Sequence, residues 1–390
     1  MVTERAAGRR PPGRRAQVLA AAEGLFHRRG YHRVSMAEVA AEVGITAPAL
    51  YRHFRSKPEL LRCAVTGGLD ALREAVRAGK DGPEQLCAAL APAAIDHRAL
   101  GTLWRRDARL LPPAQRAALR RELRAVVAET AAVVATGYPG RPAADTDLVC
   151  RSLLSAYGGL GNHTFAPPRR AFEALLRRIG ADLLAVDLAA APVLPPGRGL
   201  PYPAPVTRRE ALLVTAVRLF HERGFDNVST EELGAAVGIA GPSVYKHFGT
   251  KAELLAAALV RSRERLWQEV AGPLEGTGEP AAALAAGLAA YVDFARRNSD
   301  YLGAMVSETE RLDPSDRRVA VEFRRDFLRR WVALLQQVRP GYGDAEARIR
   351  VHAMFALVND GVRGPAGAGD TGGALVALGR AALGLDAADG

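Results

Sequence analysis

Apolar residues recur along the chain at the spacing of an α-helix. Within residues 14–29, Val18, Ala22, Leu25 and Phe26 stand at i, i+4, i+7 and i+8, which places them on one face of a helix. The same stripe returns 194 positions later, at Leu212, Ala216, Leu219 and Phe220. Few runs alternate between apolar and polar residues as strands do, and the rest of the chain is rich in Ala, Leu and Arg. The pattern predicts an all-α protein.

The repeated stripe belongs to a longer repeat. Residues 26–61 align with residues 220–255 without a gap, and about half of the positions are identical. Further on, residues 106–116 align with residues 307–317, now at an offset of 201. A segment with six prolines and two glycines, residues 190–207, separates the copies and cannot be helical. We therefore expect two tandem units, with a first head at 10–62, a first body at 63–190, a linker at 191–206, a second head at 207–257 and a second body at 258–386.

Each head contains the signals of a helix-turn-helix. After the first helix, S-x-x-E sequences at 35–38 and 229–232 predict a capping box at the start of a short second helix. That helix ends at Gly44 or Gly238, and a third helix follows, with Pro48 or Pro242 in its first turn. Two short helices joined by a glycine turn form a helix-turn-helix, whose second helix, here about 47–54 and 241–248, enters the major groove of DNA.

The combination of these features resembles the TetR family of bacterial transcriptional regulators. The motif runs from F-x-x-x-G-[YF] through the S-x-x-E helix and "GI" to Y-x-H-F, with Lys three residues on and then E-L-L. The resemblance implies a DNA-binding head on a helical body that binds a small effector and dimerises. It also implies that Tyr51, Tyr245, Lys57 and Lys251 contact phosphates, and that Ser35 and Ser229 do so in addition to capping. The residues expected to face the groove are Thr46, Ala47, Ala49, Arg52, His53, Gly241, Ser243, Lys246 and His247.

The two heads differ mainly at the positions expected to face DNA. Arg52 is replaced by Lys246, and Arg can bond guanine through two hydrogen bonds whereas Lys acts as a point charge. We therefore expect the heads to read different half-sites. Ala240 stands where the first head has Thr46, so the second recognition helix loses a cap. The second head would then bind more weakly or serve mainly as a spacer.

One chain with two heads has two ways to reach two half-sites. The two bodies can pack together as an internal pseudo-dimer, because about 16 extended linker residues span roughly 50 Å, more than one turn of DNA. The alternative is a homodimer with four heads, and the sequence leaves both open.

The bodies contain the candidates for an effector pocket, although aromatic residues at helical spacing also build cores. Basic helices and R-L-x-P stretches are similar to those of regulators of lipid and acyl-CoA metabolism in the same family, so an apolar or acyl-type effector is one candidate. The candidate pocket residues are Trp104, Tyr157, His163, Phe294, Trp331, Phe355 and Asn359.

Composition supports an anionic partner. The formal net charge is +11 and the pI is about 10.0, which suits nucleic acid or an acidic membrane surface. No run of 18 apolar residues, signal peptide, metal-binding spacing or catalytic motif occurs, and the three cysteines show no C-x-x-C spacing. We expect a cytoplasmic repressor that binds operator DNA without metal or cofactor and is not an enzyme. The alternatives are a membrane-surface or effector-binding protein with a vestigial second head, or an enzyme without a recognisable motif.

Overall fold

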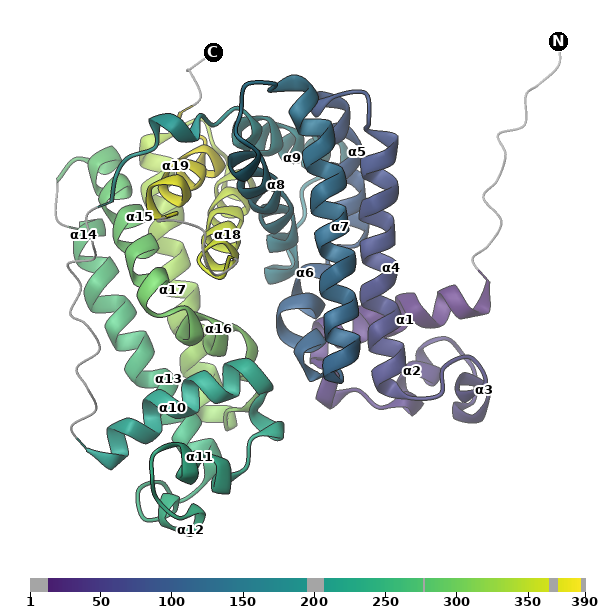
Figure 1. The fold of residues 1–390 in the computed structure, drawn as a ribbon, viewed down its shortest axis with the longest axis vertical. Helices are drawn as coiled ribbons and strands as arrows, with labels where there is room; N and C mark the ends of the chain where they lie inside the picture. The colour runs from purple at the N-terminus through teal and green to yellow at the C-terminus, as the bar shows by residue number, and fades with distance from the viewer. Residues whose placement is uncertain (1–12, 195–206, 276–277, 365–370, 387–390) are drawn as a thin grey trace.

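The computed structural model describes residues 13–194, 207–275, 278–364 and 371–386, and all regular structure in these ranges is helical, as the sequence predicts (Figure 1). Two units follow one another along the chain, each with a small head and a larger helical body. Residues 10–12 of the first expected head and most of the expected linker, residues 195–206, lie outside the described residues.

The heads have the same helix order and nearly the same bounds. The first consists of α1 (Arg14–Arg29), α2 (Met36–Glu42), α3 (Ala47–Tyr51) and the start of α4 (Lys57–Ala78). The second consists of α10 (Arg208–Arg223), α11 (Thr230–Ala236), α12 (Gly241–Val244) and the start of α13 (Lys251–Leu266). The apolar stripes of α1 and α10 are buried as predicted, and the rings of Phe54 and Phe248 close the two head cores.

Long helices form the bodies. In the first, α4 is joined by α5 (Pro83–Asp96), α6 (Leu100–Thr102), α7 (Pro113–Gly137), α8 (Ala143–Gly158) and α9 (Arg169–Leu184). In the second, α13 is joined by α14 (Gly272–Glu275), α15 (Pro280–Arg297), α16 (Ser299–Ser307), α17 (Pro314–Val338), α18 (Asp344–Gly361) and α19 (Gly372–Leu383). Helices α7 and α17 begin with Pro113 and Pro314, which suit the first turn because its N–H groups lack helical partners.

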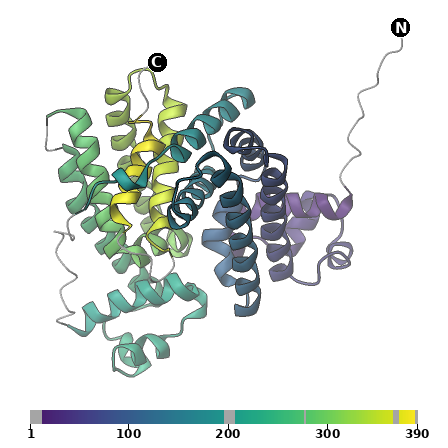
Figure 2. The same ribbon diagram turned by 45° about the horizontal axis from the view of Figure 1, so that its top comes forward.

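The two bodies pack on one another within the chain. Helices α8 and α9 lie against α18 and α19 in the middle of the molecule (Figures 1 and 2). The backbones come close at Gly159, where a Cβ atom would lie 3.0 Å from the His352 carbonyl oxygen. Arg350, almost fully buried, forms an ion pair with Asp182 of the first unit at 3.1 Å. The structure therefore has the internal pseudo-dimer arrangement, one of the two arrangements that the sequence left open.

Candidate DNA interface and body cavity

Both capping boxes predicted from the sequence are present. The Ser35 N–H donates to Glu38 Oε2 at 2.7 Å, and the Glu38 N–H donates to Ser35 Oγ at 3.1 Å. The corresponding distances at Ser229 and Glu232 are 2.8 and 3.2 Å. The bond from the Ser229 backbone, with Arg223 beside it, lowers the pKa of Glu232 to about 2. Both serines therefore act in local capping, and the structure gives no test of a phosphate contact.

The recognition helices α3 and α12 are shorter than the expected 47–54 and 241–248, and together with the residues directly after them they leave most of the side chains expected to face DNA exposed or half-buried. Leu50 and Val244 anchor the two helices in the head cores, whereas Tyr51 and Tyr245 are 49 % and 53 % exposed. The polar residues that accompany them on the surface of the two heads are Thr46, Arg52, His53, Ser243, Lys246 and His247.

The start of the recognition helix differs between the heads as the sequence predicted. Thr46 Oγ1 accepts a hydrogen bond from the Ala49 N–H at 3.4 Å, whereas Ala240 provides no side-chain cap. Gly241 is buried against α11, and a Cβ atom there would lie 2.9 Å from the Glu231 Cα. The second head therefore needs glycine at this position, where the first head has Ala47, and Gly241 offers no side chain to the groove.

Lys57 and Lys251 make contacts that the sequence did not indicate. The Lys251 ammonium donates to the carbonyl oxygens of Phe225 and Val228 at 2.8 and 2.9 Å and lies over the Phe225 ring. Lys57 lies over the Tyr31 ring in the same way, 4.4 Å from its centroid. Both amines are partly buried, which lowers their pKa values. These lysines hold the turn after the first helix, and the structure gives no test of the phosphate contacts expected of them.

A short segment of the first body holds both heads. This coupling segment, Leu103–Leu110, consists of one π-helical and one 3-10 turn after α6. Arg106 donates to the Phe26 carbonyl oxygen of the first head at 2.6 Å, and Arg109 donates to the Phe220 carbonyl oxygen of the second head at 2.7 Å. Phe26 and Phe220 are equivalent positions of the repeat, at the ends of α1 and α10. Both arginines are ion-paired with buried carboxylates, Arg106 with Asp107 and Arg109 with Glu308.

The heads also meet each other directly. His32 Nδ1 lies 3.3 Å from Asp226 Oδ2, and these two residues are again equivalent positions of the repeat, 194 apart. Arg311 pairs with the same aspartate, and Arg33 lies 3.6 Å from Glu310. Two units of identical sequence would place the same residue type on both sides of this contact. The pairing of a histidine with an aspartate therefore depends on the sequence difference between the two units.

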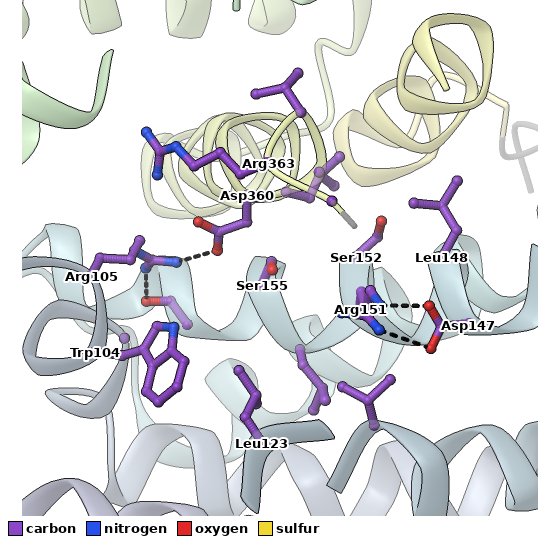
Figure 3. A pocket seen from close by; sticks show the side chains of 18 of the residues that line it. Trp104, Arg105, Leu123, Asp147, Leu148, Arg151, Ser152, Ser155, Asp360 and Arg363 are labelled. Carbon is purple, nitrogen blue, oxygen red and sulfur yellow. Dashed lines mark hydrogen bonds and ion pairs between the residues drawn. The ribbon is translucent and has the colours of Figure 1, made fainter. Parts of the chain in front are cut away.

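The first body contains a cavity of about 1940 Å³ that extends to the second unit. Trp104 and Tyr157, two of the predicted pocket residues, line it. Figure 3 shows Trp104 and Leu123 on one side of α8, with Asp360 and Arg363 of the second unit on the other. Arg105 connects the units by donating to Asp360 at 2.8 Å and to the Gly158 carbonyl oxygen at 2.6 Å (Figure 3).

The other predicted pocket residues do not line this cavity. Phe294, Trp331 and Phe355 belong to the core of the second body, where the Tyr291 hydroxyl donates to Asn359 at 2.8 Å. These side chains were expected to face an effector, but Trp331 and Phe355 pack against each other and against Tyr291, and Phe294 is buried in the same core. His163 is buried at the boundary between the units, stacked on Phe165 at 3.8 Å and 4.9 Å from the ring of His352.

No group of three or more His, Cys, Asp or Glu side chains among the described residues is placed to hold a metal ion. No helix in the described part of the chain has both the length and the apolar character needed to cross a membrane.

Comparison with known protein families supports the presence of two DNA-binding heads. The family model described as "Bacterial regulatory proteins, tetR family" matches residues 18–64 and again residues 212–258. The chain belongs to the TetR family. The two matches confirm the tandem arrangement that the repeat predicted for this TetR-family protein, and both cover the helix-turn-helix of a head.

Relatives and solved structures match parts of this TetR-family chain. It is 41 % identical over 81 residues to the HTH-type transcriptional activator FasR of Mycolicibacterium smegmatis, covering 20 % of this chain and 37 % of FasR. It is 42 % identical over 60 residues to the regulator TtgR of Pseudomonas putida, and this match covers 15 % of this chain and 27 % of TtgR. The matches thus cover 37 % of the length of FasR and 27 % of the length of TtgR. A TetR-family regulator structure from Bordetella parapertussis is 18 % identical in sequence. The match covers 46 % of this chain and 94 % of that chain, with a TM-score of 0.42. The structure of KstR2 of Mycobacterium tuberculosis is 22 % identical in sequence. The match covers 46 % of this chain and 94 % of KstR2, with a TM-score of 0.41.

Proposed function

We propose that this protein is a DNA-binding transcriptional regulator in which one chain reads two unlike half-sites. The observation that carries the proposal is the pair of complete helix-turn-helix heads, each with an exposed recognition surface, on two bodies that pack together within the chain. The net charge of +11 favours DNA as the partner.

The proposed site is asymmetric because the exposed recognition surfaces differ. Arg52 in the first head can bond guanine with both guanidinium arms, whereas Lys246 in the second supplies one compact charge. The capped α3 also begins more firmly than the uncapped α12. We propose that the first head provides most of the sequence preference and the second adds affinity, since tethering raises its local concentration to about millimolar.

We propose that a small molecule in the first body controls both heads through the coupling segment. Trp104, Arg105, Ala108 and Arg109 of this segment line the cavity, and Arg106 and Arg109 hold the ends of α1 and α10. A ligand that shifts the segment would move both heads together, which changes their spacing relative to the half-sites. We propose repression relieved by this effector; FasR is named an activator, so the direction of regulation needs a measurement.

Selection of binding sites from random duplex DNA with the full-length protein tests the proposal. Two different half-sites about one helical turn apart are the expected result. Enrichment of a perfect palindrome would contradict two unlike readers, and no enrichment would contradict a DNA-binding function. A reporter gene placed behind the selected site then gives the direction of regulation.

A further inference from the structure

We propose that each chain binds one ligand, an anion with an apolar part, in the cavity of the first body, and that the second body binds none. The inference rests on the proposed function only in taking this ligand as the effector. It stands on three features of the molecule: the walls of the cavity, its charge, and the side chains that occupy the equivalent region of the second body.

The inner wall of the cavity is apolar. Leu69 and Leu72 of α4, Trp104 of the coupling segment, and Leu123 and Val127 of α7 contribute to it. An apolar wall of this kind favours a ligand that removes apolar surface from water, at about 25 cal/mol for each Å². These residues alone would suit any hydrophobic molecule.

The charge of the lining selects among hydrophobic molecules. Nine arginines line the cavity but only five carboxylates do. Three of the arginines form a row on α7, Arg116, Arg120 and Arg124, because residues four apart share one face of a helix. Arg120 and Arg124 are exposed, and neither is ion-paired with any residue that the structure describes. Free guanidinium groups beside an apolar wall favour a carboxylate, sulfonate or phosphate on the ligand.

Larger side chains occupy the second body next to and behind the equivalent wall. At an offset of 201, Leu154, which lines the cavity, is replaced by Phe355, and the buried residues Leu90, Val126 and Thr130 of the first body are replaced by Tyr291, Phe327 and Trp331. The four rings pack together, with centroids between 4.6 and 6.4 Å apart. Trp331 is fully buried.

The row of arginines is also altered in the second body. Val321 replaces Arg120, and Arg317, in place of Arg116, is 3.0 Å from Glu310. Arg325 keeps the cation of Arg124 on an exposed part of α17. Of the two bodies as far as the structure describes them, only the first combines the apolar wall with the row of unpaired arginines, so we expect a stoichiometry of one.

Isothermal titration calorimetry of the full chain with three twelve-carbon probes tests the inference. Dodecanoate, dodecanol and dodecyltrimethylammonium share the chain and differ in head charge, and each is used below its critical micelle concentration. We expect one dodecanoate per chain, bound at least about tenfold more tightly than the other two probes. Two dodecanoates per chain, equal binding of the three probes, or no binding of dodecanoate would overturn the inference.

Matched variants locate the bound anion. Replacing both Arg120→Gln and Arg124→Gln should weaken dodecanoate about tenfold and leave dodecanol unchanged, whereas Arg325→Gln, the equivalent position of the second unit, should change neither. Leu123→Trp should reduce dodecanoate binding by filling the cavity, with folding checked by circular dichroism. An equal loss in Arg325→Gln and in the double variant would contradict the assignment to the first body.

The same preparations separate this inference from the proposed function. DNA binding is measured without a probe and probe binding without DNA. Dodecanoate binding without DNA binding would leave the ligand site intact and refute the regulator, whereas DNA binding without dodecanoate binding would refute the ligand site alone.

Discussion

The two heads retain most of their buried residues, or replace them with other apolar ones, and differ more in their exposed residues. Phe26 and Phe220, Phe54 and Phe248, and both capping boxes are retained. The groove-facing positions Thr46, Ala47, Ala49 and Arg52 have changed between the copies, whereas His53 is retained. Packing constrains a core residue because a change of one methylene group already costs stability, whereas an exposed residue is limited only by what it contacts. The comparison indicates that one scaffold carries two recognition surfaces that have diverged.

The heads also differ in how they are attached. The first head is held by Arg106 of its own unit, and the second by Arg109 of the other unit. Both attachments come from the coupling segment, next to the cavity. The second head is therefore tied to the first body by a side-chain contact, whereas the first head is also joined to it through α4.

The largest effect is expected from breaking the attachment of the second head. Arg109→Ala leaves the buried Glu308 carboxylate without its partner, so the free energy of unfolding should fall by about 3 to 5 kcal/mol. Chemical denaturation measures this loss. Arg121→Ala, an exposed position nearby on α7, should cost less than about 0.5 kcal/mol. If adding Glu308→Gln to Arg109→Ala restored no stability, a buried unpaired charge would not be the cause.

Next in size is the difference between the two recognition helices. Arg52→Ala should remove about 1 to 3 kcal/mol of discrimination at one or two base positions. Lys246→Ala should instead weaken binding to all sequences by a similar factor and reduce its salt dependence. Binding to the selected site and its single-base variants, at two salt concentrations, distinguishes these outcomes. Identical behaviour of the two variants would mean that the heads read DNA in the same way.

A smaller effect is expected at the starts of α3 and α12. Thr46→Ala should destabilise the chain by about 1 kcal/mol, and Ala240→Thr should stabilise it by up to the same amount, because the hydroxyl caps a free N–H group. Thermal unfolding of both variants checks this. A loss of stability in Ala240→Thr would show that the close packing of α11 on α12 leaves no room for the cap.

The last effect appears only at acid pH and concerns the boundary between the units. Burial lowers the pKa of His163 to about 2 and that of His352 to about 4. Both imidazoles stay neutral in the folded chain, while in the unfolded chain they take up protons below about pH 6.5. The free energy of unfolding should therefore fall as the pH falls from 6.5 towards 4. His352→Gln should flatten this dependence and His53→Gln, at an exposed site, should not; equal slopes in both variants would place the pH dependence elsewhere.

Much of this architecture could be predicted because it depends on local sequence. Ser35 with Glu38, the glycine turns and the apolar stripe of α1 fix the helix-turn-helix through contacts between neighbours in the chain. The coupling segment could not be predicted in this way. Nothing near Arg106 or Arg109 indicates which carbonyl oxygen they reach, since Phe26 and Phe220 are about 80 and 111 residues away.

The cavity shows the same limit. Trp104 and Tyr157 line the cavity, whereas Trp331 and Phe355 have the same helical spacing and fill a core instead. Aromatic residues at that spacing suit both environments, and only the neighbours decide between them. The offset of 201 between the units offered a partial signal, because Leu154, which lines the cavity, aligns with Phe355 of the aromatic core.

The central claim is that one chain provides both readers of one DNA site. Native mass spectrometry of the full-length protein on its selected duplex tests this most directly. The account predicts a complex of one 41.5 kDa chain with one duplex, unchanged as protein concentration rises to several times that of DNA. A complex that contains two chains on every site, with no one-chain species at low protein concentration, would contradict it.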